Sequence, residues 1–215
     1  MSGPGGGVFV SLEGIDGSGK STQARRLAEA LTTRNIPCLL TREPGGSRGA
    51  EEIRRLVLEG DPDRWSAETE ILLFTAARRD HLEKTIRPAL ARGEVVITDR
   101  FADSTRIFQG ITRGDLAGTV DALHDLMIGV EPDLTLLIDI DPALGLHRAT
   151  ARAGAEMRFE DMGLAFQTRA RQGFLDLAAH HARFWIIDGA RGADLVAADV
   201  LQAVLHHLGP RAADV

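Results

Sequence analysis

Short runs of apolar residues recur along the 215-residue chain and alternate with longer amphipathic stretches. The runs cover residues 8–12, 36–40, 94–98, 134–140 and 184–187. Their length and their content of β-branched residues are typical of strands that are buried on both faces of a parallel sheet. We therefore predict five strands.

The stretches between the runs carry apolar residues at helical spacing, as Leu27 and Leu31 do. They predict helices at residues 20–34, 50–59, 66–92, 116–129, 142–153, 163–181 and 193–208. Asn35 suits the left-handed turn that ends a helix, Ser66 is a candidate N-cap, and Pro88 is a candidate break. The alternation predicts an α/β fold, with a five-stranded parallel sheet, helices on both of its faces and right-handed crossovers.

Composition and charge exclude several classes of protein. Apolar residues make up 44% of the chain and charged residues 26%, which is ordinary for one globular domain. We expect a flexible segment at residues 1–7, a single domain at 8–209 and a tail at 210–215. No apolar run reaches the ~18 residues of a membrane span, and the net charge of −6 argues against a nucleic-acid partner. The single cysteine, Cys38, and the lack of a signal-like start predict a cytoplasmic protein.

One glycine-rich segment carries a specific chemical signature. It reads Gly14-Ile15-Asp16-Gly17-Ser18-Gly19-Lys20-Ser21-Thr22, fits G-x-x-x-x-G-K-[ST], follows the first apolar run and opens the first helix. Its glycines allow backbone N–H groups to converge on a phosphate, and the helix N-terminus adds partial positive charge. Lys20, one of only two lysines, would bring charge to the β- and γ-phosphates, and Ser21 a hydroxyl to Mg²⁺. The segment predicts an ATP-binding phosphate loop, or P-loop.

A P-loop is shared by GTPase switches, motor ATPases and small-molecule kinases. The second half of the chain has no lysine, so the guanine-reading Asn-Lys-x-Asp of switches is absent. The run at 134–140 does not end in the adjacent acids that motors usually show. Arginines stand instead at strand ends and helix starts, at Arg42, Arg54, Arg78, Arg100, Arg152 and Arg158. Because one guanidinium group can donate two hydrogen bonds to the oxygens of a phosphate, this pattern favours phosphoryl transfer between two anions.

Five segments carry a more specific pattern. They are residues 12–22, with the acid Asp16 inside the loop; 41–46 with 52–54; 72–78; 99–105 continuing to 108–110; and 132–139 with 158–160. In this order, over about residues 8–190, they resemble the bacterial thymidylate kinases, which are nucleoside monophosphate kinases. The resemblance implies the three-layer P-loop NTPase fold with a short lid. It also implies Mg²⁺-dependent transfer of the γ-phosphate of ATP to dTMP, giving dTDP and ADP, and a homodimer.

The resemblance implies roles on the side of the phosphate acceptor. Phe74 would stack on thymine, and Arg78 with Gln109 or Thr105 would read the polar edge of the base. From the residues alone, the helical spacing of Phe74 with Ile71 and Leu73 favours a core residue. Since Arg78 follows Phe74 by one helical turn, we interpret the pair as part of a base site.

The remaining acceptor residues would hold the phosphate and the sugar. The resemblance implies that Arg54 and Arg100 grip the 5′-phosphate of dTMP, and that Asp16 contacts the 3′-hydroxyl side of the sugar. Arg100 follows a predicted strand, and ligands bind at the carboxyl ends of such strands. The alternatives are a surface salt bridge for Arg100 and a loop cap for Asp16.

On the donor side, the resemblance adds catalytic residues to Lys20 and Arg100. Asp99 would be the acid near Mg²⁺, together with Ser21, or a base-like partner for the acceptor. Residues 148–160 resemble the lid, in which Arg152 and Arg158 would stabilise charge on the transferring phosphoryl group. The alternative for this segment is a solvated surface.

The chain departs from the family pattern at several positions. Ala77 stands where the family often has an acid before the arginine, so the partner of Arg78 is missing or lies elsewhere. Met157 replaces a frequent lid acid, Gly17 replaces the loop arginine of one family branch, and the chain has no tyrosine. Two other functions stay open at this point. One is a kinase for another nucleotide or nucleoside on the same fold, and the other is a non-catalytic nucleotide-binding module.

Overall fold

The computed structural model describes residues 6–61, 64–112, 114–151 and 163–209. Within these ranges the strands β1 (Val8–Glu13), β2 (Cys38–Arg42), β3 (Val95–Asp99), β4 (Leu134–Asp139) and β5 (Phe184–Asp188) form one sheet. All pairs are parallel and the order is β2-β3-β1-β4-β5. The five predicted strands are confirmed, with ends that differ by one or two residues.

The strand order locates the site. After β1 the chain crosses to β2 at one edge of the sheet, and after β4 it crosses to β5 at the other edge, although β1 and β4 are neighbours. Such a reversal opens a crevice at the carboxyl ends of the two strands, where α/β proteins bind ligands. The predicted P-loop follows β1 directly, so it lies at this crevice.

The helices confirm the predicted alternation. They are α1 (Lys20–Thr33), α2 (Arg48–Leu58), α3 (Ala67–His81), α4 (Arg87–Ala91), α5 (Ala102–Thr105), α6 (Ala117–Met127), α7 (Pro142–Thr150), α8 (Gly163–His180) and α9 (Ala193–Leu208). Two π-helical turns, η1 (Leu82–Ile86) and η2 (Arg106–Ile111), join α3 to α4 and extend α5. As expected, Asn35 is left-handed after α1 and the Ser66 hydroxyl caps α3.

Pro88 does not break the predicted helix at 66–92. The chain stays helical from α3 through η1 into α4. Just before the proline, the N–H of Arg87 donates to the carbonyl of Leu82, a bond to the fifth residue back. Because proline has no N–H to donate, a widened turn beside it accommodates the missing bond without ending the helix.

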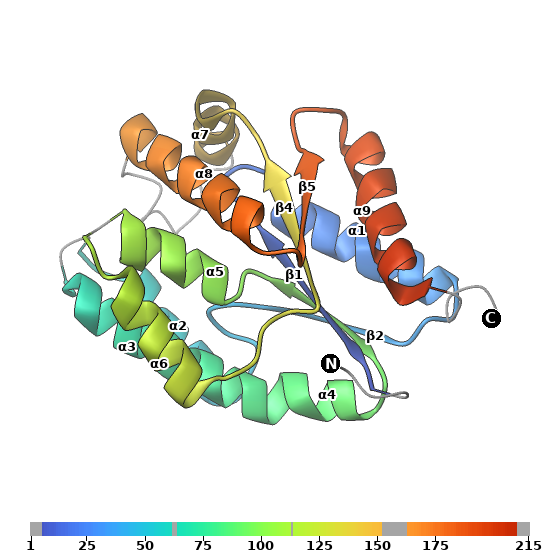
Figure 1. Ribbon diagram of the computed structural model, residues 1–215, viewed down its shortest axis with the longest axis horizontal. Coiled ribbons are helices and arrows are strands. Elements are labelled where there is room, and N and C mark those ends of the chain that lie inside the picture. Colours follow the sequence, from blue (N-terminus) through green and yellow to red (C-terminus); the bar gives the residue numbers. More distant parts are fainter. Residues whose placement is uncertain (1–5, 62–63, 113, 152–162, 210–215) are drawn as a thin grey trace.

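The helices cover both faces of the sheet and give three layers (Figure 1). On one face, α1 and α9 pack against the sheet through a core that includes Leu27, Leu31 and Val200. On the other face, η1, α4, η2 and α8 supply two further clusters, which include Ile86 and Phe174. The core holds the strand ends rigidly, so that the loops at these ends can carry chemistry.

The helical segment formed by α5 and η2 was not predicted. Its buried residues include Asp103, Ser104, Thr105 and Gln109, so it lacks an apolar stripe with polar residues opposite. A helix that buries polar side chains on a binding site does not show the amphipathic period on which sequence prediction rests.

Several expectations fall on residues outside the described ranges. These are residues 1–5 of the N-terminal segment, the tail at 210–215, and lid residues 152–160 with Arg152 and Arg158. In the part of the chain that the structure describes, no helix has the length and apolarity needed to cross a membrane.

Candidate active site

The P-loop links β1 to α1 with three glycines at positive φ. Gly14 has φ 140°, Gly17 has φ 73°, and Gly19, the residue before α1, has φ 100°. These values suit glycine because a Cβ atom disfavours positive φ in other residues. At Gly17 a Cβ would also lie 2.0 Å from the carbonyl oxygen of Gly145 in α7. The loop therefore packs backbone to backbone against α7, and the arginine of the other family branch does not fit at position 17.

Lys20 is buried inside the loop it belongs to. Its Nζ donates to the carbonyls of Gly14 at 2.9 Å and Ile15 at 2.7 Å, and to the hydroxyl of Ser18 at 3.2 Å. Burial, followed by the neighbouring charge of Arg100, lowers the pKa of Lys20 from 10.5 to about 8. The ammonium group is thus held at the centre of the loop in an environment that weakens its hold on the proton.

The two predicted metal-binding residues lie together. The Ser21 hydroxyl donates to Asp99 Oδ2 at 2.5 Å, which joins the start of α1 to the end of β3. In the described part of the chain, no cluster of three or more histidine, cysteine, aspartate or glutamate residues could hold a metal ion. A hydroxyl beside a carboxylate is a pair of hard oxygen donors, which is the kind of partial ligand set that Mg²⁺ uses.

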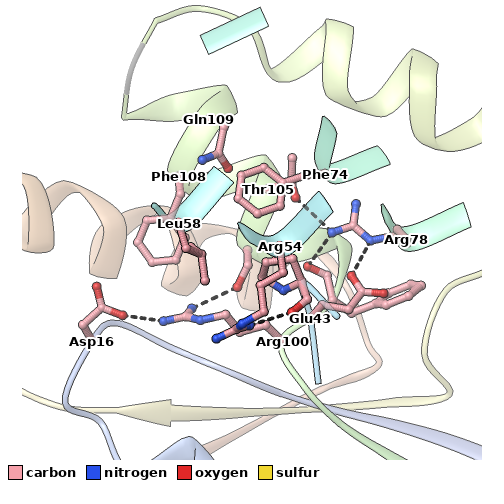
Figure 2. Close-up of a pocket in the computed structure, with 13 residues that line it drawn as sticks. Asp16, Glu43, Arg54, Leu58, Phe74, Arg78, Arg100, Thr105, Phe108 and Gln109 are labelled. Atoms are coloured by element: carbon pink, nitrogen blue, oxygen red, sulfur yellow. Dashed lines mark hydrogen bonds and ion pairs between the residues drawn. The ribbon is translucent and has the colours of Figure 1, made fainter. Parts of the chain in front are cut away.

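All seven predicted acceptor residues line one cavity beside the P-loop (Figure 2). They are Asp16, Arg54, Phe74, Arg78, Arg100, Thr105 and Gln109. The cavity holds about 810 Å³ of space free of protein atoms, part of it open to solvent at the mouth. Phe74 is half-buried and belongs to none of the three core clusters, so its side chain is available to the cavity. Leu58 and Phe108 also line the cavity, although sequence reasoning gave neither of them a role in the site.

Arg78 has its partner in Glu43, not in a neighbour on its own helix. Its Nε donates to Glu43 Oε2 at 2.7 Å, and its Nη2 donates to the hydroxyl of Thr105 at 2.9 Å and to the carbonyl of Phe101 at 3.2 Å. His81 Nδ1 lies 3.0 Å from Glu43 Oε1. Glu43 directly follows β2 inside the segment 41–46, and this position after a strand end was a signal that could have identified it.

Arg100 stands between the P-loop and the cavity. It has the left-handed φ of 72°, which is uncommon for a residue other than glycine. Its guanidinium pairs with Asp16 at 2.5 Å and donates to the Gly14 carbonyl at 3.1 Å and to the Ser104 hydroxyl at 3.0 Å. Arg100 is therefore a fixed bridge between two parts of the site, and its ion pair is not a surface one.

Asp16 is tied to the loop and to α8. Burial raises the pKa of its carboxyl, but Arg100 and Lys20 oppose this, and the pKa lies below its usual value. Gln167 of α8 donates to Asp16 Oδ2 at 3.1 Å and accepts from its backbone N–H at 3.4 Å. Sequence reasoning missed Gln167, because a lone glutamine in a helix far along the chain gives no signal.

Arg54 and Gln109, which also line the cavity, are oriented by hydrogen bonds to neighbouring groups. Arg54 Nη1 donates to the carbonyl of Pro44 at 2.6 Å, which ties α2 to the loop after β2. Gln109 Nε2 donates to Glu70 Oε2 at 3.2 Å, and both residues are buried.

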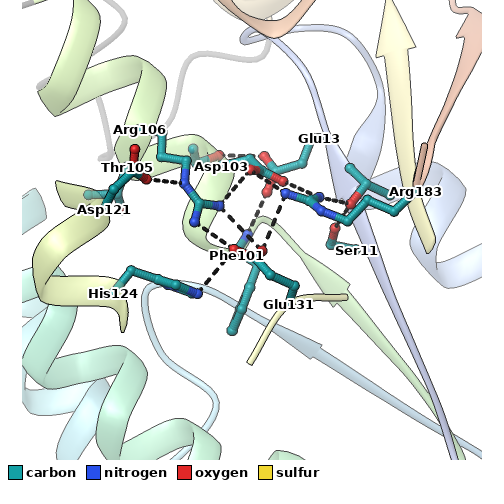
Figure 3. A network of polar contacts seen from close by, with 12 residues as sticks. Ser11, Glu13, Phe101, Asp103, Thr105, Arg106, Asp121, His124, Glu131 and Arg183 are labelled. Carbon is teal, nitrogen blue, oxygen red and sulfur yellow. Dashed lines mark hydrogen bonds and ion pairs between the residues drawn. The ribbon is translucent and has the colours of Figure 1, made fainter. Parts of the chain in front are cut away.

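A buried polar network fastens α5 to the sheet behind the cavity (Figure 3). Asp103 accepts hydrogen bonds from Arg106 and Arg183, both of which also contact Glu131. Beside it, Glu13 accepts from the N–H of Phe101 at 2.7 Å and from the hydroxyl of Ser104 at 2.6 Å. Burial and the charge of Asp103 raise the pKa of Glu13 to about 7. The network holds the turn that carries Arg100.

Comparisons with known proteins find similar sequences and a similar structure. The family model described as thymidylate kinase matches residues 12–200. A thymidylate kinase of Ruegeria pomeroyi is 70% identical over 203 residues, which cover 94% of this chain and 96% of that protein. One of Caulobacter vibrioides is 50% identical over 205 residues, covering 94% and 98%. The crystal structure of thymidylate kinase from Ehrlichia chaffeensis superposes with a TM-score of 0.76 at 35% identity, covering 93% of this chain and all of that one.

Proposed function

Because the chain belongs to the thymidylate kinase family, whose reaction is the ATP-dependent phosphorylation of dTMP to dTDP, we propose that the cavity beside Phe74 binds dTMP and the P-loop binds ATP. One observation carries the assignment. The residues expected to contact the base, the sugar and the phosphate come from separate parts of the chain, yet all line the same cavity next to the loop.

The base lies beside Phe74 and Arg78 in this proposal. Phe74 offers an aromatic face for stacking. Arg78, fixed by Glu43 and Thr105, donates a hydrogen bond to a carbonyl oxygen of thymine. A guanidinium held by a buried carboxylate keeps one direction, and such preorganisation reduces the entropy lost when the ligand binds.

The phosphate of dTMP lies between Arg54 and Arg100. Arg100 contacts the loop carbonyl of Gly14, so a phosphate on this arginine is close to the ATP site. An oxygen of the dTMP phosphate attacks the γ-phosphorus of ATP. The bond between that phosphorus and the oxygen that bridges it to the β-phosphate breaks, and ADP leaves. A phosphate is already ionised near neutral pH, so the attack needs no strong general base.

On the donor side, Lys20 and the loop N–H groups hold the phosphates of ATP and compensate the charge that develops on them. Ser21 and Asp99 would hold Mg²⁺, since their oxygens lie side by side where α1 begins and β3 ends. Mg²⁺ held by these two residues would neutralise part of the negative charge of the ATP phosphates. Arg152 and Arg158 stay predicted lid residues, and the cytoplasmic location stays a prediction as well.

We also propose a homodimer through α3 and α6. Leu72, Leu126 and Met127 are 58%, 78% and 47% exposed, and Arg79 of α3 donates to the carbonyl of Met127, so the two helices are adjacent. Light scattering tests the proposal. Leu126→Glu should halve the molar mass, while Leu195→Glu, on the exposed side of α9, should leave it unchanged. A monomeric wild type would refute the dimer.

Arg54 and Arg55 give a matched test of the acceptor site. They are neighbours in α2, but Arg54 lines the cavity and Arg55 is exposed. Arg54→Ala should raise the KM for dTMP by about tenfold or more, because it removes a charged hydrogen-bond donor, and Arg55→Ala should not. Thymidine, used as a competitive inhibitor, has no phosphate, so its Ki should respond to Phe74→Ala but not to Arg54→Ala. Equal KM values for both arginine variants would reject the assignment.

A further inference from the structure

A buried carboxylate lies behind the base end of the cavity and has no role in the mechanism above. Glu70, in the first turn of α3, is fully buried. It lies one helical turn before Phe74, and its Oε2 is 3.2 Å from Gln109 Nε2 in η2. Gln109 is 2% exposed and lines the cavity, so its amide lies between the carboxylate and the space for the base.

The chemistry of the pair decides which way the amide faces. An ionised carboxylate only accepts hydrogen bonds, whereas an amide has a donating NH₂ group and an accepting oxygen. Accordingly, Gln109 turns its NH₂ group to Glu70. The carbonyl oxygen, Oε1, is then the atom that Gln109 can offer to a ligand.

We propose that Glu70 is a positioning residue that fixes Gln109 as a hydrogen-bond acceptor and so makes the site select thymine and uracil over cytosine. The inference rests on the proposed binding of dTMP in this cavity. The edge of thymine carries an accepting O4 and a donating N3–H, whereas cytosine carries a donating amino group and an accepting N3. An arginine donor with an amide acceptor matches the first edge and is mismatched to the second.

The pair also explains why a glutamine alone would select poorly. A glutamine with a neutral partner could rotate its amide by half a turn and offer NH₂ to the N3 of cytosine. The carboxylate of Glu70 opposes this rotation, since the rotated amide would place its oxygen against an anion. Discrimination thus depends on a residue behind the one that touches the base.

The test compares dUMP with dCMP, because neither has the 5-methyl group and the two differ only at the hydrogen-bonding edge. The quantity measured is the ratio of kcat/KM for dUMP to kcat/KM for dCMP. Glu70→Gln should lower this ratio about tenfold, the effect of one mispaired buried hydrogen bond, with the KM for ATP unchanged. Glu68→Gln is the matched control, since Glu68 is in the same helical turn but exposed, and it should leave the ratio as in the wild type.

Gln109→Leu separates the role of Glu70 from the assignment of the base site. This variant should lower the ratio too, and adding Glu70→Gln to it should have no further effect, since the residue through which Glu70 acts is gone. A lower ratio in Gln109→Leu with an unchanged ratio in Glu70→Gln would overturn the inference and leave the proposed site intact. An unchanged ratio in Gln109→Leu would overturn both. If Glu70→Gln lowered kcat/KM equally for dUMP and dCMP, the role of Glu70 would be merely structural, and this result would also overturn the inference.

Discussion

The contact between the P-loop and α7 gives the sharpest prediction. Gly17 has a φ of 73°, and a Cβ atom at this position would lie 2.0 Å from the carbonyl oxygen of Gly145. Conversely, a Cβ at Gly145 would lie 2.8 Å from the carbonyl oxygen of Asp16. The loop and α7 therefore approach each other through two residues without side chains. Gly17→Ala perturbs this approach by a single methyl group.

The magnitude follows from the distances. A Cβ atom needs at least 3.0 Å from a backbone oxygen, so the loop and α7 must separate by about 1 Å. A 1 Å misplacement of groups that hold a substrate costs about 100-fold in rate, and we expect that loss in kcat/KM for ATP. The left-handed backbone adds about 1–2 kcal/mol to the loss of folding stability.

Gly129→Ala is the control, because it separates backbone strain from the clash. Gly129 has a φ of 61°, and a Cβ atom there would meet nothing nearer than 3.7 Å. In urea denaturation, the free energy of unfolding of this variant should fall by the same ~1–2 kcal/mol. Its kcat/KM for ATP should stay unchanged. If Gly17→Ala matched Gly129→Ala in both stability and kinetics, the packing of α7 against the loop would have no part in holding the ATP site.

Four charged residues give the remaining predictions. Arg100→Ala should raise the KM for dTMP and lower kcat; a change in ATP saturation alone would assign Arg100 to the donor side. Glu43→Ala leaves the buried guanidinium of Arg78 without its carboxylate, so urea denaturation should show a loss of about 3–5 kcal/mol, and a loss below about 1 kcal/mol would contradict the burial argument. Because the pKa of Lys20 is lowered to about 8, kcat/KM for ATP should fall as pH rises through that value, and a profile flat to about pH 9.5 would refute it. The pKa of Glu13 is raised from 4.5 to about 7, so the folded chain binds this proton more tightly than the unfolded chain does. The stabilisation that the bound proton provides is complete below pH 4.5 and is lost as pH rises through 7. Stability measured from about pH 5 to 8 should therefore fall less in Glu13→Gln than in the wild type, and equal slopes would contradict the assignment.

The sequence determined the architecture and the loop. Apolar runs of strand length alternating with amphipathic stretches are local patterns, and each strand and most helices could be read from them because burial on a sheet face imposes its period directly on the residues. The P-loop could also be predicted from the sequence, since its glycines, Lys20 and Ser21 lie in one short segment and their spacing is set by the backbone geometry of one turn.

Only the tertiary structure decided which partners hold the site residues in place. Glu43 and Arg78 are 35 positions apart, Glu70 and Gln109 are 39 apart, and Asp16 and Gln167 are 151 apart. Nothing in a local pattern links such residues, because their contact depends on how the strands are ordered in the sheet. The helical segment at 102–111 escaped prediction for a related reason: its polar side chains are buried by contacts with the sheet, α3 and α8, which exist only in the folded chain.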